Sequence, residues 1–208
     1  MSNSSGNLLI VAAPSGGGKT SLIDALLAED ERLRLSVSHT TRRPRPDEID
    51  GRHYHFISAE RFEAMVEAGE FLEHAEVFGC RYGTSRAAVE EHLTRGVDVI
   101  LEIDWQGARQ IRAAFGRCRS VFILPPSLEI LCQRLERRAT DTEAVIQRRM
   151  RDAQSEISHW DEFDYLLVND DFDTALADLR AILRSLRLSR NYQQERHRGL
   201  LAELLGTG

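Results

Sequence analysis

Residues 13–20 have the sequence Ala-Pro-Ser-Gly-Gly-Gly-Lys-Thr, and their surroundings constrain the fold more than any other feature of the chain. The apolar run Leu8–Ala12 comes directly before them, and a helical pattern of apolar residues comes directly after. A glycine-rich turn between a buried strand and a helix lets several backbone N–H groups converge on an anion. The helix adds the positive end of its dipole at the same place. The sequence therefore predicts a phosphate loop, residues 13–20, in an α/β fold.

Two residues at the end of this phosphate loop suit a nucleoside triphosphate. Lys19, the only lysine of the chain, supplies a full charge to the outer phosphates, and Thr20 offers a hydroxyl to Mg²⁺. The pattern departs from the usual one at Ala13, which stands where a glycine is usual. Glu102 and Asp104 follow another apolar run, so either carboxylate is expected beside the loop, where it can orient Mg²⁺ through water. The sequence leaves open how these two carboxylates divide their roles.

Short apolar runs alternate with helical patterns over most of the chain, which is the order of elements in an α/β fold around a parallel sheet. Each run is short enough for a strand, and three are rich in Val and Ile, as strands buried on both faces tend to be. The candidate strands are Leu8–Ala12, Val97–Ile103, Val121–Leu124 and Asp164–Val168.

Polar residues that precede apolar patterns mark where helices are expected to begin. Ser58, Ser127, Thr142 and Asp173 each stand before such a pattern. The stretch from Leu183 to Gly208 is expected to form one amphipathic helix with a short tail. Its leucines either pack on the core or form a subunit contact in a homo-oligomer.

Charge and composition exclude several classes of protein. With 27 basic and 33 acidic residues, the net charge of −6 disfavours a general nucleic-acid binder. No apolar run approaches the roughly 20 residues of a membrane helix. The three cysteines are widely spaced and form neither a metal motif nor a disulfide framework, which is typical of free thiols in a reducing cytoplasm.

Two arginine-rich regions interrupt the alternation of strands and helices. Residues 36–90 have the composition of a small inserted lobe, in which three arginines surround the stiffening Pro44. Guanidinium groups there, with tyrosine hydroxyls farther along, suit a phosphate monoester. Residues 134–151 hold further arginines, which form either a solvated helix face or, beside a phosphate loop, part of the phosphate site.

With these segments the chain resembles the bacterial guanylate kinases over nearly its whole length. The resemblance implies a P-loop parallel-sheet core flanked by helices, with an inserted lobe that binds a nucleoside monophosphate and an arginine-rich lid. The distinctive matches are Ser-His-Thr-Thr-Arg at 38–42, Glu-Val-Phe-Gly at 76–79 and Asp-Trp-Gln-Gly at 104–107. The implied parts are a core (7–35, 91–133 and 152–208), a GMP-binding lobe (36–90) and a lid (134–151).

The resemblance also implies a role for each matching residue. The ATP-binding residues are Ala13, Pro14, Ser15, Gly16, Gly17, Gly18, Lys19, Thr20, Ser21 and Asn169, the last of these near the adenine. The GMP-binding residues are Ser38, Glu73, Thr84 and Asp104 at the guanine, and Arg42, Arg45, Tyr54 and Tyr82 at the phosphate. The catalytic residues are Lys19, Arg42, Arg134, Arg138 and Arg149, and Mg²⁺ is held by Thr20, with Glu102 acting through water.

Chemistry at Glu73 agrees with this assignment. Guanine offers N1–H and its 2-amino group as adjacent donors, and one carboxylate accepts from both. Adenine has neither donor, and a site that leaves buried polar groups unpaired rejects the analogue by roughly 10⁴-fold or more. The activity that the resemblance implies is ATP-dependent phosphorylation of GMP to GDP in cytoplasmic purine metabolism, with no nucleic acid or membrane partner. The sequence leaves open whether dGMP is also accepted. The alternatives are another nucleoside monophosphate kinase, or a non-catalytic binding module of the same fold.

Overall fold

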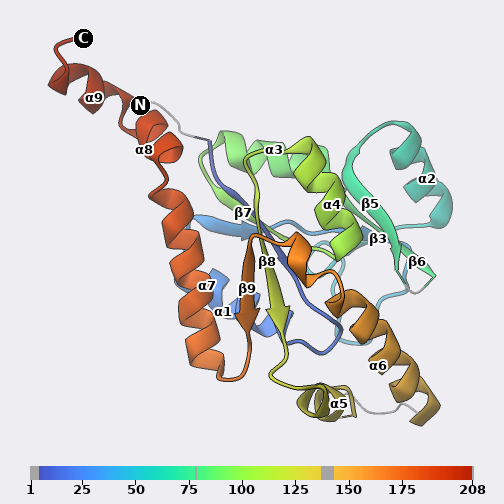
Figure 1. The fold of residues 1–208 in the computed structure, drawn as a ribbon. Helices are drawn as coiled ribbons and strands as arrows, with labels where there is room; N and C mark the ends of the chain where they lie inside the picture. The colour runs from blue at the N-terminus through green and yellow to red at the C-terminus, as the bar shows by residue number, and fades with distance from the viewer. Residues whose placement is uncertain (1–4, 78, 137–142, 208) are drawn as a thin grey trace.

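The computed structural model of the protein describes residues 5–77, 79–136 and 143–207. Its core is a five-stranded sheet with the order β2-β7-β1-β8-β9, in which every pairing is parallel (Figure 1). Because the first strand is central, the phosphate loop leaves the middle of the sheet at its carboxyl edge, where parallel α/β folds bind ligands. The predicted α/β core is confirmed. The strands are β1 (Leu8–Ala12), β2 (Leu33–Leu35), β7 (Asp98–Glu102), β8 (Arg119–Leu124) and β9 (Tyr165–Val168).

Helices cover both faces of this sheet, because successive side chains of a strand point to opposite sides. On one face lie α1 (Lys19–Glu29) and α7 (Phe172–Arg187), and on the other lie α3 (Arg86–Thr94) and α4 (Trp105–Ala114). Leu9 and Val11 of β1 pack with α1 and α7, while Leu8 and Ile10 pack with α3 and α4. All of β1 is buried. Burial of each of its leucine and isoleucine side chains stabilises the fold by roughly 1.5–3 kcal/mol. The phosphate loop is thus attached to a fully buried strand.

The inserted region contains a second sheet of four strands, with the order β4-β3-β6-β5. This sheet and α2 (Ala59–Glu67) lie together to the right of the core in Figure 1. Phe62 and Met65 of α2 pack on Phe71 of the sheet and form a separate small core. The sheet ends at Ser85, and α3, which begins at the next residue, packs on the main core. The strands are β3 (His39–Thr40), β4 (His55–Phe56), β5 (Phe71–Val77) and β6 (Cys80–Ser85).

The arginine-rich region lies mostly on two helices, α5 (Leu128–Glu136) and α6 (Glu143–Ile157). Ala153 of α6 is fully buried against Leu131 and Leu135 of α5, which joins the two helices. The predicted catalytic Arg138 and the predicted helix start at Thr142 lie outside the described residues. A short 3₁₀ helix, η1 (Trp160–Glu162), connects α6 to β9.

The predicted helix starts at Ser58 and Ser127 are confirmed, because each hydroxyl accepts a hydrogen bond from the backbone N–H three residues later. The prediction at Asp173 is wrong: α7 begins at Phe172 and is capped by Asp171. The Asp171 carboxylate accepts from both the backbone N–H (2.9 Å) and the hydroxyl (2.7 Å) of Thr174. Among the predicted strands β1 has the expected bounds. Strand β7 is one residue shorter at each end than predicted, β8 begins two residues earlier and β9 begins one residue later.

The prediction of one helix from Leu183 to Gly208 is also wrong. After α7 the chain forms two short helices, α8 (Arg190–Arg196) and α9 (Arg198–Leu204), which lead away from the core (Figure 1). The break lies at Ser189, whose backbone is extended (φ −58°, ψ 142°). The Gln193 amide donates to the carbonyl of Arg187 at 2.6 Å and satisfies the end of α7. No helix in the described ranges is long and apolar enough to cross a membrane.

Candidate active site

The phosphate loop has the backbone that its glycines predict. Gly16 and Gly18 both have a φ of +88°, a left-handed conformation that side chains with a Cβ rarely adopt. Asn169, which follows β9, donates from Nδ2 to the carbonyl oxygen of Gly17 at 3.0 Å. A Cβ on Gly18 would lie only 2.3 Å from the same nitrogen. The side chain of Asn169 therefore holds the loop closely, and its predicted proximity to adenine stays a prediction.

Lys19 and Thr20 lie at the start of α1 beside a carboxylate from β7. The Thr20 hydroxyl donates to Glu102 Oε1 at 2.7 Å, and Lys19 Nζ lies 3.8 Å from the same oxygen. This neighbourhood follows from the sheet, because β1 and β7 pair in parallel with Val11 opposite Glu102. Of the two carboxylates that the sequence left open, Glu102 is thus the one beside the phosphate loop.

Asp104 has a different position, at the start of α4. Its Oδ1 accepts from the N–H of Gly107 at 2.9 Å, and its Oδ2 accepts from the side-chain amide of Gln106 at 3.1 Å. A Cβ on Gly107 would lie 2.5 Å from Glu73 Oε2, so this end of α4 packs on Glu73, and the charge of Asp104 contributes to the raised pKa of Glu73. Asp104 thus lies between the core and the inserted lobe.

Glu73 is a buried carboxylate with few means of solvation. It is 3% exposed, and its Oε1 accepts from the Thr84 hydroxyl across β5 and β6 at 2.6 Å. A Cβ on Gly107 would lie 2.5 Å from Oε2, so only a glycine at the start of α4 leaves room for the carboxylate. Burial is the main cause that raises the pKa of Glu73 to about 7, and the Thr84 hydroxyl opposes it. A buried carboxylate of this kind calls for hydrogen-bond donors from a ligand.

The predicted phosphate residues of the lobe gather on its sheet and on the loop before β4. Tyr54 and Tyr82 lie edge to face with ring centres 5.8 Å apart, and the Arg42 guanidinium lies 5.3 Å from the Tyr54 ring centre. Burial is the main cause that raises the pKa of Tyr54 to about 12, so its hydroxyl stays a donor at neutral pH. Ser38 stands directly before β3, and its carbonyl accepts from the N–H of His55 at 2.9 Å.

Glu48 is a residue of the candidate site that the sequence analysis missed. Its carboxylate accepts two hydrogen bonds from the Arg42 guanidinium, at 2.7 and 2.9 Å, and one from the backbone N–H of Arg45 at 2.7 Å. The Arg42 guanidinium holds the pKa of Glu48 below its usual range. The side chain of Arg45 is 68% exposed and lies 3.9 Å from Glu48, so it stays available to another anion. The cluster therefore holds the side chain of Arg42 by two hydrogen bonds and leaves that of Arg45 exposed.

Among the lid arginines, Arg134 is placed most clearly. Its Nη2 donates to the carbonyl of Asn169 at 3.0 Å, while its Nη1 is buried without a hydrogen-bond partner among the described residues. A Cβ on Gly18 would lie 4.0 Å from that Nη1, so the guanidinium faces the phosphate loop. Arg149 lies partly buried on α6.

Glu156 is a second residue that the sequence analysis missed. It lies near the end of α6, and its Oε2 accepts from the backbone N–H of Ser15 in the phosphate loop at 2.9 Å. Burial raises the pKa of Glu156, while the Ser15 hydrogen bond and the charge of Lys19 oppose the rise. The structure therefore attaches α6, the first part of which belongs to the predicted lid, directly to the phosphate loop.

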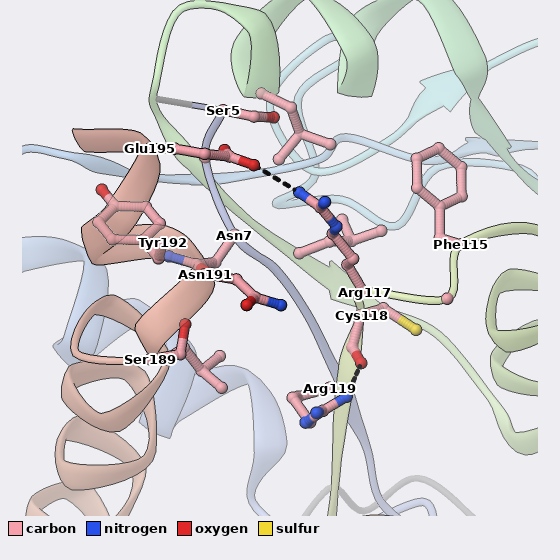
Figure 2. A pocket seen from close by; sticks show the side chains of 15 residues that line it. Ser5, Asn7, Phe115, Arg117, Cys118, Arg119, Ser189, Asn191, Tyr192 and Glu195 are labelled. Carbon is pink, nitrogen blue, oxygen red and sulfur yellow. Dashed lines mark hydrogen bonds and ion pairs between the residues drawn. The ribbon is translucent and has the colours of Figure 1, made fainter. Parts of the chain in front are cut away.

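A separate hollow of about 310 Å³ lies at the opposite edge of the main sheet, between the starts of β1 and β8 and helix α8 (Figure 2). Arg117 and Glu195 pair beside it at 2.8 Å. None of the predicted site residues in the described ranges lines this hollow. The predicted chemistry instead gathers at the carboxyl edge of the sheet, around Lys19, and on the lobe beside it.

Comparison with known proteins gives one consistent result. A family model described as guanylate kinase matches residues 5–186. The guanylate kinase of Nitrosococcus oceani is 61% identical over 201 residues, which cover 97% of this chain and 99% of that protein. The guanylate kinase of Alkalilimnicola ehrlichii is 60% identical, covering 96% and 97%. A crystal structure of guanylate kinase from Anaplasma phagocytophilum matches with a TM-score of 0.75 and 36% identity, over 90% of this chain and 89% of that one.

Proposed function

This chain belongs to the guanylate kinase family of nucleotide-binding transferases, and we propose that it transfers the γ-phosphoryl group of ATP to GMP, giving ADP and GDP. The observation that carries the choice of acceptor is the buried carboxylate of Glu73 beside Thr84 and Asp104. Guanine brings two adjacent N–H donors to such a carboxylate, whereas adenine would place a lone pair against it. The acceptor base is therefore guanine.

The proposed acceptor phosphate lies among Arg42, Arg45, Tyr54 and Tyr82. Arg42 is already oriented by Glu48, so little side-chain entropy remains to be lost when the phosphate binds. Tyrosine hydroxyls donate to the remaining phosphate oxygens. This arrangement suits the dianionic end of a nucleoside monophosphate.

The proposed donor site is the phosphate loop with Lys19, to which Arg134 and Arg149 add positive charge. An oxygen of the GMP phosphate attacks the γ-phosphorus in line, and the bond to the bridging oxygen of ADP breaks. The attacking oxygen is already anionic, so the reaction requires no general base. Catalysis consists of positioning and charge neutralisation, and a well-placed arginine contributes about 10³–10⁵ in rate. Arg138, outside the described residues, is proposed for the same role.

The oxygen atoms near the phosphate loop fit a magnesium ion that enters with the nucleotide. The Thr20 hydroxyl and the Glu102 carboxylate, 2.7 Å apart, are hard oxygen donors of the kind that Mg²⁺ prefers. The described residues contain no group of three or more His, Cys, Asp and Glu side chains that could hold a metal ion by themselves. A site of one or two protein oxygens plus substrate phosphates is usual for Mg²⁺. Thr20 and Glu102 would hold the ion, which would supply positive charge against the phosphates of the nucleotide.

We propose that the parts act as a core (residues 7–35, 91–133 and 152–208), a GMP lobe (36–90) and a lid (134–151). Closure of the lobe and lid would exclude water, which otherwise competes for the γ-phosphoryl group. The proposed setting is purine nucleotide metabolism in the cytoplasm, and the free thiols of Cys80, Cys118 and Cys132 support a reducing compartment.

The direct test is to incubate the protein with ATP, Mg²⁺ and GMP and to measure ADP and GDP separately. The proposal predicts equal amounts of the two products, and chelation of Mg²⁺ stops both. ADP without GDP would mean hydrolysis and would contradict transfer to GMP. Absence of both products would favour a non-catalytic binding module of the same fold.

A further inference from the structure

The phosphate loop is attached to α6 at two independent places. The first is the hydrogen bond from the Ser15 N–H to Glu156 Oε2, across 141 residues of sequence. The second is apolar and passes through α5. Ala153 of α6 is fully buried against Leu131 and Leu135, and a Cβ on Gly16 would lie 3.0–3.1 Å from the tips of these two leucines. The loop and α6 therefore pack on a common support.

Glu156 supplies the polar part of this contact, and the burial of its carboxyl group is unfavourable. Burial raises the pKa of the Glu156 carboxyl, which means that the folded chain disfavours its charge. Simple packing on α5 would be served by an apolar side chain at this position. The Glu156 carboxyl supplies a hydrogen-bond acceptor for a backbone N–H of the loop, which an apolar side chain cannot do.

Arg149 and Glu156 are seven residues apart on α6, which is close to two turns. They therefore lie on the same stripe of the helix, about 10 Å apart along its axis. A rigid helix that is held at Glu156 restricts the positions that Arg149 can take when the proposed lid closes. Ala153, one turn from each, keeps that stripe against α5.

We propose that Glu156 is a positioning residue that holds α6 to the phosphate loop and thereby sets the position of Arg149 relative to Lys19. The inference rests on the proposed function, because it assigns Arg149 to the transferring phosphoryl group. Glu156 contacts the loop backbone and acts through Arg149 and the shape of the loop. It accepts a hydrogen bond and neither donates nor removes a proton in the reaction.

The experiment compares Glu156→Gln, Glu156→Asp and Glu156→Ala with the wild type. Glutamine keeps an acceptor oxygen at the same reach, aspartate keeps the charge but is one methylene shorter, and alanine has neither. Gln154→Ala, at an exposed position of the same helix, is the matched control. Thermal unfolding is recorded for every variant, so that the aspartate variant serves if the alanine variant does not fold.

The alanine and aspartate variants are expected to lower kcat/KM for ATP by about 10- to 100-fold, the usual effect of a misplaced catalytic group. KM for GMP stays unchanged, the glutamine variant stays close to wild type, and the affinity for Mg·ADP measured by calorimetry falls with alanine. A wild-type rate in the alanine variant would overturn the proposal. So would tighter binding of Mg·ADP, which would mean that the carboxylate competes with the nucleotide phosphates.

A double-mutant cycle with Arg149→Ala separates positioning from general stability. If Glu156 acts through Arg149, adding Glu156→Ala to Arg149→Ala lowers kcat no further. Independent, multiplying losses of kcat would contradict the link. If the wild type does not phosphorylate GMP, the proposed function fails, and the Mg·ADP affinities of the Glu156 variants still decide whether this residue shapes the loop.

Discussion

The hydroxyl of Thr84 donates a hydrogen bond to Glu73 Oε1 at 2.6 Å, between two neighbouring strands of the lobe sheet and out of contact with water. This bond stabilises the charged form of a carboxyl whose pKa burial raises to about 7. Glu73 is therefore close to half protonated at neutral pH in the free protein. Guanine, which donates to the charged carboxylate, binds best when the proton has been lost.

The first prediction concerns the pH dependence of GMP use. Because Glu73 must lose a proton to accept from guanine, kcat/KM for GMP rises as pH increases towards about 7 and levels off above it. The phosphate of GMP titrates in a nearby range, so the same profile is measured with Glu73→Gln, which retains only the substrate's titration. Identical acid limbs in the two proteins would assign the dependence to GMP and contradict the role of Glu73.

The second prediction concerns Thr84. Thr84→Val removes the hydroxyl at nearly constant volume, so the charged form of Glu73 loses its hydrogen bond and the pKa of Glu73 rises further. The acid limb of the GMP profile therefore moves to higher pH, and KM for GMP at pH 7 increases. Thr84→Ser keeps the donor and restores the wild-type profile. An unchanged acid limb in the valine variant would show that this bond does not govern the site.

The third prediction concerns Glu48. Glu48→Gln removes the charge that holds Arg42, so the guanidinium loses its orientation towards the acceptor phosphate. We expect KM for GMP to rise by roughly tenfold, which corresponds to about 1.4 kcal/mol, with KM for ATP unchanged. The exposed neighbour Asp47→Asn is the control and behaves as wild type. A lower KM for GMP would instead mean that Glu48 competes with the phosphate for Arg42.

The fourth prediction uses the single lysine of the chain. An amine-directed reagent modifies the side chain of Lys19 and the terminal amine only, which mass spectrometry resolves peptide by peptide. Mg·ATP is expected to slow modification of Lys19 and leave the terminal amine unaffected, so the second site is an internal control. Lys19→Met lowers kcat by roughly 10²–10³-fold, the usual cost of removing a group that stabilises transition-state charge. Equal labelling of Lys19 with and without Mg·ATP would contradict the donor site.

Local patterns in the sequence predicted the parts of the site that depend on adjacent residues. The strand, glycine-rich turn and helix around Lys19 lie next to one another in the chain, so the phosphate loop could be predicted directly. A carboxylate beside the loop could also be predicted, because the ends of parallel strands meet at one edge, but only the structure shows that Glu102 and not Asp104 accepts from Thr20. This rule about parallel strands made the prediction possible although the two segments lie far apart in the sequence.

The sequence did not reveal Glu48 or Glu156. In a sequence, a glutamate that contacts a functional site cannot be told apart from a glutamate on the surface. Glu48 stands six residues after Arg42 in a polar stretch, and only the excess of arginines nearby could have suggested a carboxylate partner. The contact of Glu156 with Ser15 depends on how α6 packs against α5. No periodic pattern records that packing.

Two errors have simple local causes. Several acidic residues stand near the start of α7, and each is a possible cap. Thr174 distinguishes Asp171 from the others, because its N–H and its hydroxyl both donate to the Asp171 carboxylate. The leucines between residues 183 and 208 keep a spacing typical of a helix on both sides of Ser189, where the helix is interrupted. Hydrophobic spacing alone did not detect that break.

The most direct test of the account is ADP formation from ATP and Mg²⁺ with GMP, AMP, CMP and UMP in parallel, for the wild type, Glu73→Gln and the exposed control Glu76→Gln. We predict activity with GMP alone, a loss of roughly 100-fold in kcat/KM in Glu73→Gln from the mispaired buried group, and wild-type behaviour of Glu76→Gln. Equal turnover of AMP by the wild type, or full activity of Glu73→Gln with GMP, would contradict the assignment of Glu73 as the group that selects guanine.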